Sequence, residues 1–411
     1  MTPTLRFPEF KGAWEAKHGD DAFQSRRQRA VDGLPLYSVT MDQGMVRRDS
    51  LEREFASNAP DESNLRVFKD DHVYNMMRMW QGAVGRAPED CMVSPAYVVL
   101  QPKPETVPAF FDHWFKRRRS IYLLWAYSYG LTSDRLRLYA RDFGRVPMAL
   151  PASDEQRRIA DFLSAVDDRI VLLQRRRDAL AQYKTGLRQG LFSQSVRFKR
   201  DDGSTFPNWG SCELGSLFDW VATNSLSRDM LTDEPSTVQN IHYGDIHGKF
   251  AARFRQSAES APFIKADALP KAIRDEDYCR PGDVIIADAS EDYADIGKAI
   301  EIIEVAPKTI VAGLHTYIAR PKAGLLALGF SGYLFQTWAL RRQIMRNAQG
   351  ISVLGISKPN LAKLTVPLPH PDEQRKIADC LGAVDDKIAA VSAQVRQMKA
   401  FKQGLLQQMF V

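Results

Sequence analysis

The sequence predicts a mixed α/β (α+β) protein with a pseudo-twofold internal repeat, in which two globular bodies are joined by two long antiparallel coiled-coil helices. Three observations predict this fold. A stretch of 43 residues occurs twice, each copy carries a heptad pattern of apolar residues, and each follows a region of mixed strand and helix signals. The expected division is 1–149 and 195–367 for the bodies, with 150–194 and 368–411 for the helices.

The repeat aligns residues 150–192 with residues 368–410 at a constant offset of 218, without a gap. Twenty of the 43 positions are identical. Both copies read Leu-Pro-x-x-Asp-Glu-Gln-Arg-x-Ile-Ala-Asp-x-Leu-x-Ala-Val-Asp-Asp. Unrelated segments would share only a few positions, so we expect both halves of the chain to have one architecture.

Each body begins with a short lead-in segment, 1–19 in the first and 195–210 in the second. Arg6-Phe7 and Trp14 of the first segment have counterparts in Arg197-Phe198 and Trp209 of the second. The offset rises from 191 at the Arg-Phe pair to 218 at the helices, so the second body is about 27 residues longer. The repeated unit is therefore larger than the helix.

The first body contains β-branched and aromatic runs at 36–40 and 91–100, which predict strands. The aromatic-rich segment 107–127 predicts a helix or a bent helical pair. The run Lys116-Arg-Arg-Arg119 lies within this segment. It either contacts phosphate or forms a solvated helix face.

The first helix has apolar residues at alternating spacings of four and three over about five heptads, and the second repeats this pattern. The acidic pairs Asp154-Glu155 and Asp372-Glu373 stand at the expected N-termini, where negative charge suits the helix dipole. Lys184 and Lys402 occupy equivalent positions of the seam, the line of heptad positions that otherwise carries apolar residues. They either fix the register of the helix pair or mark fraying, with the ammonium groups extending to solvent.

The second body contains β-branched runs at 283–287, 299–303 and 310–318, which predict strands. Residues 326–348 predict a helix, and a glycine-rich loop at 350–355 leads toward the second long helix. Each body is therefore expected to mix helices and strands.

The composition is that of an ordinary globular protein, with 44% hydrophobic and 26% charged residues. The net charge of +6 mildly favours an anionic partner. The four cysteines have no paired spacing, which indicates reduced thiols in a cytoplasmic protein. The longest apolar run, near 121–129, is too short to cross a bilayer, so no membrane association is expected.

Catalytic motifs are missing from the sequence. It has neither the glycine-rich cofactor loop nor the polar-Pro-Pro-aromatic loop of a DNA amino-methyltransferase, and no His-Glu-x-x-His. Gly350 and Gly355 have phosphate-loop spacing, but no lysine follows the second glycine. The acidic cluster 288–292 lacks the lysine of a metal-dependent nuclease and is better explained as a polar turn. We therefore expect no catalytic residues, no metal site and no cofactor bound by this chain.

Two variable bodies joined by two near-identical heptad helices, each opening Asp-Glu-Gln-Arg-x-Ile-Ala, resemble the specificity subunit of type I restriction-modification systems. The resemblance covers essentially the whole chain. It extends to Gly244-Asp-Ile-His-Gly-Lys249 and Gly313-Leu-His315 in the second body and to Ser94-Pro95-x-Tyr97 in the first.

The resemblance implies that each body is a target-recognition domain that reads one half of a split, asymmetric site in double-stranded DNA. It further implies that the helices set the half-site spacing and dock two methyltransferase subunits, which motor-nuclease subunits join in the prokaryotic cytoplasm. S-adenosylmethionine, ATP and Mg would then belong to the partner subunits. This agrees with the residue-based prediction, because a rigid connection makes half-site spacing a geometric quantity.

The candidate DNA-binding residues are cationic, amide and hydrogen-bonding side chains in the predicted loops, which suit base edges and phosphates. They are Arg47, Arg48, Asn75, Arg78, Arg86, Lys116, Arg117, Arg118, Arg119, Asn240, His242, Tyr243, Lys249, Ser290, Lys298, His315 and Lys358. The candidate partner-binding residues lie at the helix starts, where structural salt bridges between the two long helices are the competing interpretation. They are Glu155, Arg157, Arg158, Glu373, Arg375 and Lys376.

Two other functions remain open from the sequence. An autonomous DNA enzyme is disfavoured by the missing motifs. A coiled-coil adaptor that binds only proteins would lack the DNA affinity, falling steeply with salt, that a DNA-reading protein shows.

Overall fold

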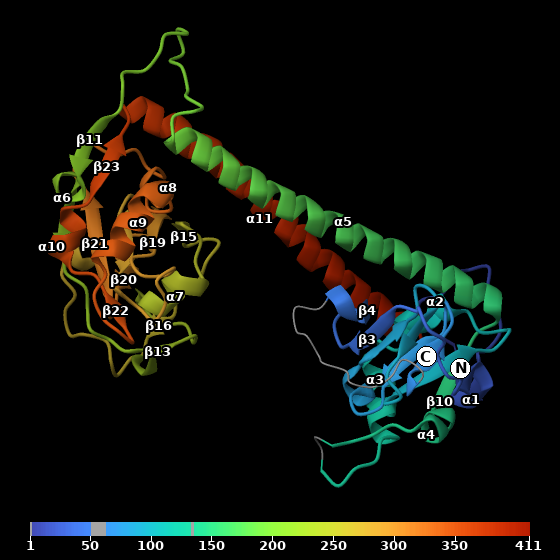
Figure 1. Ribbon diagram of the computed structural model, residues 1–411. Coiled ribbons are helices and arrows are strands. Elements are labelled where there is room, and N and C mark those ends of the chain that lie inside the picture. The colour runs from blue at the N-terminus through green and yellow to red at the C-terminus, as the bar shows by residue number, and fades with distance from the viewer. Residues whose placement is uncertain (1, 51–62, 133–134) are drawn as a thin grey trace. The chain divides into compact units, whose positions relative to one another are not determined.

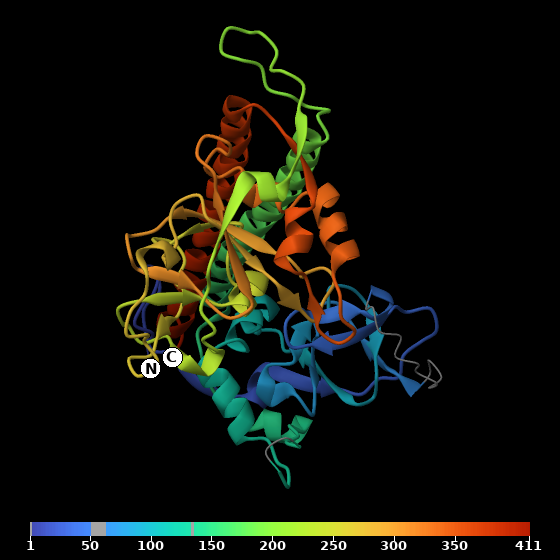
Figure 2. The ribbon, with the colours of Figure 1, turned by 90° about the vertical axis from the view of Figure 1, so that its left-hand side faces the viewer.

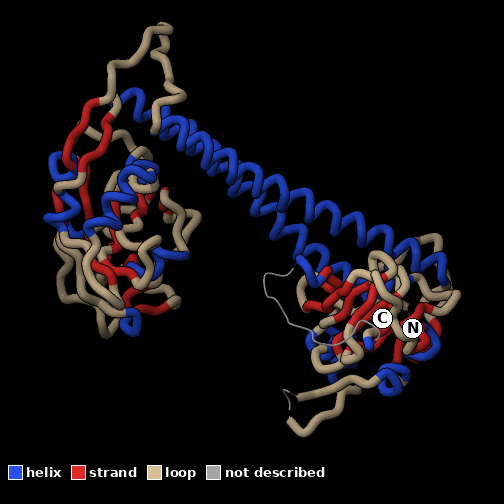
Figure 3. Tube along the Cα trace, in the orientation of Figure 1, coloured by secondary structure: helices blue, strands red, loops and turns tan. Residues whose placement is uncertain are grey.

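The computed structural model describes residues 2–50, 63–132 and 135–411, and the chain forms two compact units (Figure 1). Unit 1 comprises residues 1–175 and 391–411, and unit 2 comprises residues 176–390. Each unit holds a body of strands and short helices together with part of each long helix (Figure 3). The predicted mixed α/β class and internal repeat are confirmed.

The body of unit 1 contains two four-stranded sheets, ordered β2-β9-β6-β7 and β4-β3-β8-β5, and a β1-β10 pair. Its strands are β1 (Glu15–His18), β2 (Phe23–Arg26), β3 (Leu36–Thr40), β4 (Gly44–Arg47), β5 (Leu65–Val67), β6 (His72–Asn75), β7 (Val84–Arg86), β8 (Cys91–Val93), β9 (Tyr97–Pro102) and β10 (Pro147–Leu150). Its helices are α1 (Gly19–Ala22), α2 (Pro108–Trp114), α3 (Arg118–Ala126) and α4 (Ala140–Gly144).

The core of unit 1 lies on both faces of the β2-β9-β6-β7 sheet. Successive side chains of a strand point to opposite faces. Tyr74 and Leu100 therefore pack among the aromatic residues of α2. Their neighbours Val73 and Val99 pack against the second sheet. The two layers that cover the sheet are thus fixed by the alternation within β6 and β9.

The body of unit 2 repeats this arrangement with a five-stranded sheet, β12-β21-β17-β19-β15, a four-stranded sheet, β13-β16-β14-β20, and the pairs β11-β23 and β18-β22. Its strands are β11 (Gly210–Glu213), β12 (Phe218–Val221), β13 (Leu231–Thr232), β14 (Gln239–Ile241), β15 (Arg253–Arg255), β16 (Phe263–Ile264), β17 (Val284–Ala287), β18 (Ala289–Ser290), β19 (Ala299–Glu304), β20 (Ile310–Ala312), β21 (Thr316–Pro321), β22 (Leu354–Gly355) and β23 (Thr365–Leu368). Its helices are α6 (Leu214–Leu217), α7 (Tyr243–Gly248), α8 (Ser331–Leu334), α9 (Trp338–Asn347) and α10 (Lys358–Ala362).

The five-stranded sheet of unit 2 separates the helices α8 and α9 from the smaller sheet (Figure 2). Val284 and Ile286 of β17 contact the helical side, whereas Ile285 faces the smaller sheet. The layer order is therefore the same as in unit 1.

Three predicted elements are each divided in two. The predicted strand 91–100 is β8 and β9, and the predicted strand 310–318 is β20 and β21. In the second case His315 has a left-handed φ of 55°, which turns the chain within the apolar run. The predicted helix 326–348 is α8 and α9, separated at Thr337, whose hydroxyl caps α9. The bent helical pair expected over 107–127 is confirmed as α2 and α3.

The long helices are α5 (Ser153–Phe192) and α11 (Pro371–Gln408). Most predicted seam residues are buried, among them Leu163 and Leu173 of α5 and Leu381 and Val395 of α11. The two helices pack together and run antiparallel within each unit, since early residues of one contact late residues of the other. The predicted helix pair is confirmed.

The two seam lysines form equivalent ion pairs between the helices. In unit 1 the Nζ of Lys402 lies 2.6 Å from Oδ2 of Asp167, and in unit 2 the Nζ of Lys184 lies 2.6 Å from Oδ1 of Asp385. Both lysines and both aspartates are related by the offset of 218. These contacts favour the interpretation in which the lysines fix the register.

Unit 2 also contains a buried carboxylate at Glu301 of β19. Its oxygens accept hydrogen bonds from the backbone N–H groups of Gly329 at 2.6 Å and Gly332 at 2.7 Å. Burial raises the pKa of Glu301 to about 7 despite these donors. This side chain ties β19 to the start of α8.

Candidate nucleic-acid interface

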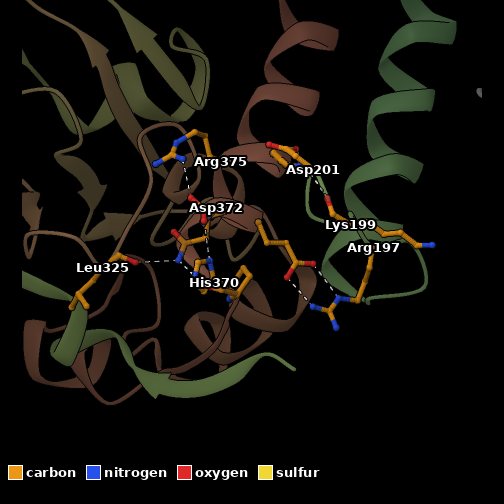
Figure 4. A network of polar contacts seen from close by, with 11 residues as sticks. Arg197, Lys199, Asp201, Leu325, His370, Asp372 and Arg375 are labelled. Carbon is orange, nitrogen blue, oxygen red and sulfur yellow. Dashed lines mark hydrogen bonds and ion pairs between the residues drawn. The ribbon is translucent and has the colours of Figure 1, made fainter. Parts of the chain in front are cut away.

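The start of α11 is held by a network of polar contacts around its Glu373-Gln374 pair (Figure 4). The buried carboxylate of Glu373 accepts two hydrogen bonds from the guanidinium of Arg197, at 3.0 and 2.8 Å, and one from the indole N–H of Trp209 at 2.9 Å. Gln374 donates to the carbonyl of Leu325 at 3.0 Å and accepts from the N–H of Ala327 at 2.9 Å.

The start of α5 repeats this network in unit 1. Glu155 accepts two hydrogen bonds from Arg6, both of 2.7 Å, and one of 3.3 Å from Trp14. Gln156 accepts from the N–H of Val107 at 3.0 Å. The Glu-Gln pair of the repeated motif therefore fastens each lead-in segment and the loop before α2 or α8 to a long helix.

Glu155 and Glu373 were expected at an exposed docking face, and this expectation is wrong. Both are at most 2% exposed, because the arginine and tryptophan of the lead-in segments cover them. The competing interpretation of ion pairs between the two long helices is also wrong for these two residues, because their partners come from the lead-in segments.

The basic residues of the helix starts divide into two kinds. The Nζ of Lys376 lies 2.5 Å from Oδ1 of Asp201, and Arg158 stacks 4.7 Å from the centroid of the Phe7 ring, so both help to hold the lead-in segments. Arg157 and Arg375 are exposed, and each pairs with the aspartate three residues earlier, at 2.9 and 3.0 Å. These two arginines remain available to a partner.

The candidate base-reading residues of unit 1 lie at the ends of β4, β6 and β7. Arg47 and Arg78 are exposed, and Arg48 and Asn75 are partly exposed. Arg86 pairs with Asp70 at 2.7 Å and Asp112 at 2.9 Å. Its guanidinium is therefore committed to an internal network, which weakens its assignment to DNA.

The basic run before and within α3 is exposed at Lys116, Arg118 and Arg119 but buried at Arg117. Arg117 donates to the carbonyl of Val411 at 2.7 Å and lies 4.8 Å from the centroid of the Phe410 ring. Burial lowers the pKa of its guanidinium to about 10. The expectation that Arg117 contacts phosphate is therefore wrong, because the side chain is engaged by Phe410 and Val411 instead.

Three candidate residues of unit 2 are buried and cannot reach DNA in this conformation. Asn240 accepts a hydrogen bond from Asn224 at 2.8 Å, His242 caps α7 through the N–H of Gly244, and Ser290 accepts from the N–H of Asp292. Burial also lowers the pKa of His242. These three predictions are wrong because the side chains are buried, with Oδ1 of Asn240, the His242 ring and the Ser290 hydroxyl each bonded to a local partner.

The remaining candidates of unit 2 include a surface cluster to which α7, β21, α10 and two turns contribute. The ring of Tyr243 meets that of His315 edge-on at 5.4 Å, and Nδ1 of His315 lies 3.2 Å from Oδ1 of Asp288. Tyr317 also hydrogen-bonds Asp288, and the Nζ of Lys358 lies 5.0 Å from the centroid of the Tyr317 ring. Burial and the Asp288 charge raise the pKa of Tyr317 to about 12, so the phenol stays protonated.

Sequence reasoning did not select Asp288 and Tyr317 of this cluster, and the turn at His315 brings both to the other three side chains. Their positions in the sequence could have identified them. Asp288 directly follows the buried strand β17, and Tyr317 is a half-buried residue of β21. Of the other two lysines in the candidate set, Lys249 is exposed and Lys298 donates to the carbonyl of His247 at 2.6 Å.

The described residues contain no group of three or more His, Cys, Asp or Glu side chains that could hold a metal ion. Within the same residues, no helix is long and apolar enough to cross a membrane.

Comparisons with solved structures support the fold. The chain aligns over 100% of its length with the S subunit of a type I restriction-modification system from M. genitalium, with a TM-score of 0.57 and 15% identity, covering 99% of that chain. A chain from a structural study of complex assembly and conformational transition of the type I R-M system aligns over 98% of both chains, with a TM-score of 0.57 and 17% identity. At these identities the likeness shows the fold alone.

Sequence comparisons identify the family. The curated MjaVIII type I restriction enzyme specificity subunit of Methanocaldococcus jannaschii is 22% identical over 274 residues, which span 64% of this chain and 61% of that protein. The family model for the type I restriction modification DNA specificity domain matches residues 21–182 and again residues 209–397. Two matches that together cover most of the sequence, one beginning in each repeated half, show that the chain belongs to the type I restriction-modification DNA specificity family.

Proposed function

We propose that this chain is the DNA-reading, non-catalytic subunit of a type I restriction-modification assembly, and that each unit reads one half of a bipartite, asymmetric target in double-stranded DNA. The observation that carries the proposal is that two units of one fold present different side chains at equivalent strand ends. In unit 2, Asp288 follows β17 and His315 lies between β20 and β21, and Tyr243 of α7 joins them in one cluster. In unit 1, Asn75 stands at the end of β6, which occupies the place of β17 in the sheet order.

The candidate residues that stay accessible have distinct roles in this proposal. Cationic and amide side chains suit guanine and adenine edges, respectively, in the major groove, while further cations hold phosphates. In unit 1 the base-reading set is Arg47, Arg48, Asn75 and Arg78, with Lys116, Arg118 and Arg119 on phosphate. In unit 2 the set is Tyr243, Lys249, His315 and Lys358.

The long helices provide the connection and the docking surface. Arg157 and Arg375 are exposed at equivalent positions of α5 and α11, which suits two copies of one partner. We assign these positions to two methyltransferase subunits, with motor-nuclease subunits joining them in the prokaryotic cytoplasm. S-adenosylmethionine, ATP and Mg then act on the partner subunits, and this chain supplies sequence recognition.

The test is base-resolved methylation mapping of DNA from cells that express the chain with its cognate methyltransferase subunit. We expect a single bipartite motif. His315→Ala should relax or abolish one half-site and leave the other intact, whereas Arg78→Ala should affect only the other half-site. Absence of any motif, with an active partner and a folded chain, would favour an adaptor that binds only proteins.

A salt titration separates the same alternatives in vitro. DNA affinity of the purified complex should fall steeply with salt, because each phosphate contact releases about one counterion. An affinity that does not depend on salt would contradict the proposal.

A further inference from the structure

Unit 2 carries a short hairpin, residues 349–355, whose shape is fixed by its backbone. Gln349 and Gly355 exchange two N–H···O bonds, of 2.9 and 2.7 Å. Gly350 has a φ of +124°, and a Cβ there would lie 2.0 Å from the carbonyl oxygen of Val353. Glycine is therefore required at this turn, and the next residue, Ile351, projects fully into solvent with a relative exposure of 102%.

Unit 1 has an equivalent hairpin after α3. Tyr129 and Arg137 exchange two N–H···O bonds, of 2.9 and 2.8 Å, and a Cβ on Gly130 would lie 2.5 Å from the carbonyl oxygen of Arg135. The residue after this glycine is Leu131, which is also 102% exposed. Residues 133 and 134 lie outside the described part of the chain.

The shared feature is a large aliphatic side chain at the same place in two loops of different sequence. A single exposed leucine or isoleucine on a protein surface needs no explanation. Here the glycine and the aliphatic residue both recur at an offset of 220, although the residues that follow them differ. An exposed aliphatic side chain that recurs directly after the same turn glycine indicates a function that both units share.

The stretches of sequence that carry the two hairpins are rich in lysine and arginine. Residues 336–365 contain five lysines and arginines and no acidic residue, and residues 116–145 contain eight lysines and arginines against two aspartates. These two stretches together carry more positive charge than the whole chain, whose net charge is +6. Arg342, Arg346 and Lys363 are exposed in unit 2, as are Arg118 and Arg119 in unit 1.

The positive charge of these stretches favours DNA over a protein as the partner that contacts the two hairpin tips. A protein partner that buried the two tips would have to present acidic surface to both units, whereas DNA presents phosphates to any cationic surface and an apolar base stack behind them. Architectural DNA-binding proteins insert leucine or isoleucine side chains as wedges between base steps while nearby cations hold the backbone.

The hairpin of unit 2 also adjoins the proposed reading surface. Its second strand, β22, pairs with β18, and the N–H of Ile356 donates to the carbonyl of Asp288 at 2.9 Å. The same Asp288 contacts His315 of the cluster. DNA that lies against His315 and Lys358 therefore passes close to the loop that carries Ile351.

We propose that Ile351 in unit 2 and Leu131 in unit 1 are DNA wedges, each of which inserts beside a base step of its own half-site while the exposed arginines of α9 or α3 hold the flanking phosphates. This inference rests on the proposed DNA-reading function and adds recognition through DNA deformation. A half-site would then owe part of its specificity to an easily unstacked step that no hydrogen-bonding side chain touches.

The test uses the full chain in complex with its methyltransferase subunit and duplexes that contain the mapped target. 2-Aminopurine, whose fluorescence rises when it unstacks, replaces one base at a time across both half-sites. We expect a several-fold rise at one step in each half-site. Ile351→Ala should remove the rise in one half-site and Leu131→Ala in the other, whereas Ile351→Leu should retain it. Ser352→Ala, an exposed change in the same loop, is the matched control.

Each alternative outcome has a distinct meaning. An unchanged fluorescence pattern in Ile351→Ala and Leu131→Ala would overturn the wedge. Loss of the methyltransferase subunit from either variant on gel filtration, with the pattern unchanged in the complex that remains, would assign the tips to protein docking and also overturn it. If the wild-type complex methylates no bipartite motif, the proposed function itself has failed, and this result is separate from the fluorescence pattern.

A second measurement tests the cationic part of the surface. Arg342→Gln and Arg346→Gln should each reduce the slope of log affinity against log salt by about 1, without changing the preferred sequence. An unchanged slope in both variants would contradict phosphate contact by α9.

Discussion

At the residue scale, several side chains whose chemistry suits DNA are already engaged by other parts of the protein. Asn240 and Arg117 have the right functional groups for DNA, yet one satisfies Asn224 and the other anchors Val411. The spacing of apolar residues does not predict which side chains are buried in loops and short elements. Burial there is determined by contacts with residues distant in the sequence. His315 and Lys358 are accessible, and their contact with DNA stays a prediction. Asp288, which contacts His315, was not among the candidates.

The buried glutamates of the repeated motif lead to a prediction about stability. Glu373→Ala should destabilise unit 2 by about 1–3 kcal/mol, because it removes the acceptor of the hydrogen bonds from Arg197 and Trp209. Asp372→Ala changes the neighbouring exposed residue and should cost about 1 kcal/mol or less. Chemical denaturation of the two variants measures the difference, and equal costs would contradict the structural role.

At the element scale, prediction succeeded where a pattern was long and failed where one residue changed the chain direction. Both long helices were predicted because their heptads continue through many turns. The division of 310–318 into β20 and β21 was not, since it depends on the left-handed conformation of His315, which an apolar run does not reveal.

The interhelical ion pairs give a prediction at this scale. Lys184→Met and Asp385→Asn should be non-additive, with a coupling free energy of about 1 kcal/mol in a double-mutant cycle, because each partner is partly shielded from solvent. Lys402 and Asp167 should behave alike, since they form the equivalent pair. Lys387→Met, at an exposed position of α11, serves as the control. Additive effects at both pairs would show that the lysines do not fix the register.

At the scale of the whole molecule, the internal repeat was the most informative feature of the sequence. It predicted two copies of one architecture before any strand was assigned, and the folds of the two units agree with this. It could not predict what each unit recognises, because the proposed reading surfaces lie in the parts of the bodies whose sequences differ.

The proposed spacer role of the helices predicts a change in target spacing. Insertion of one heptad into α5 and one into α11 keeps the seam in phase and lengthens the pair by about 10.5 Å, which is roughly three base pairs of DNA. Methylation mapping should then show both half-sites unchanged with a spacer about three base pairs longer. An unaltered spacer in a folded, active variant would show that the long helices do not set the half-site spacing.

The buried Glu301 couples the folding of unit 2 to proton concentration. Its pKa is about 7 in the folded protein, against an ordinary 4.5, so the folded state holds this proton more tightly than the unfolded chain does. The stability that this proton contributes is complete below pH 4.5 and is lost as the pH rises through 7. Glu301→Gln, which stays neutral, should therefore gain about 3 kcal/mol relative to the wild type between pH 4.5 and pH 8. Unfolding measured across that range would reveal the effect, and a constant difference would exclude it. A DNA-reading unit would then carry, within its core, a group that titrates close to neutral pH.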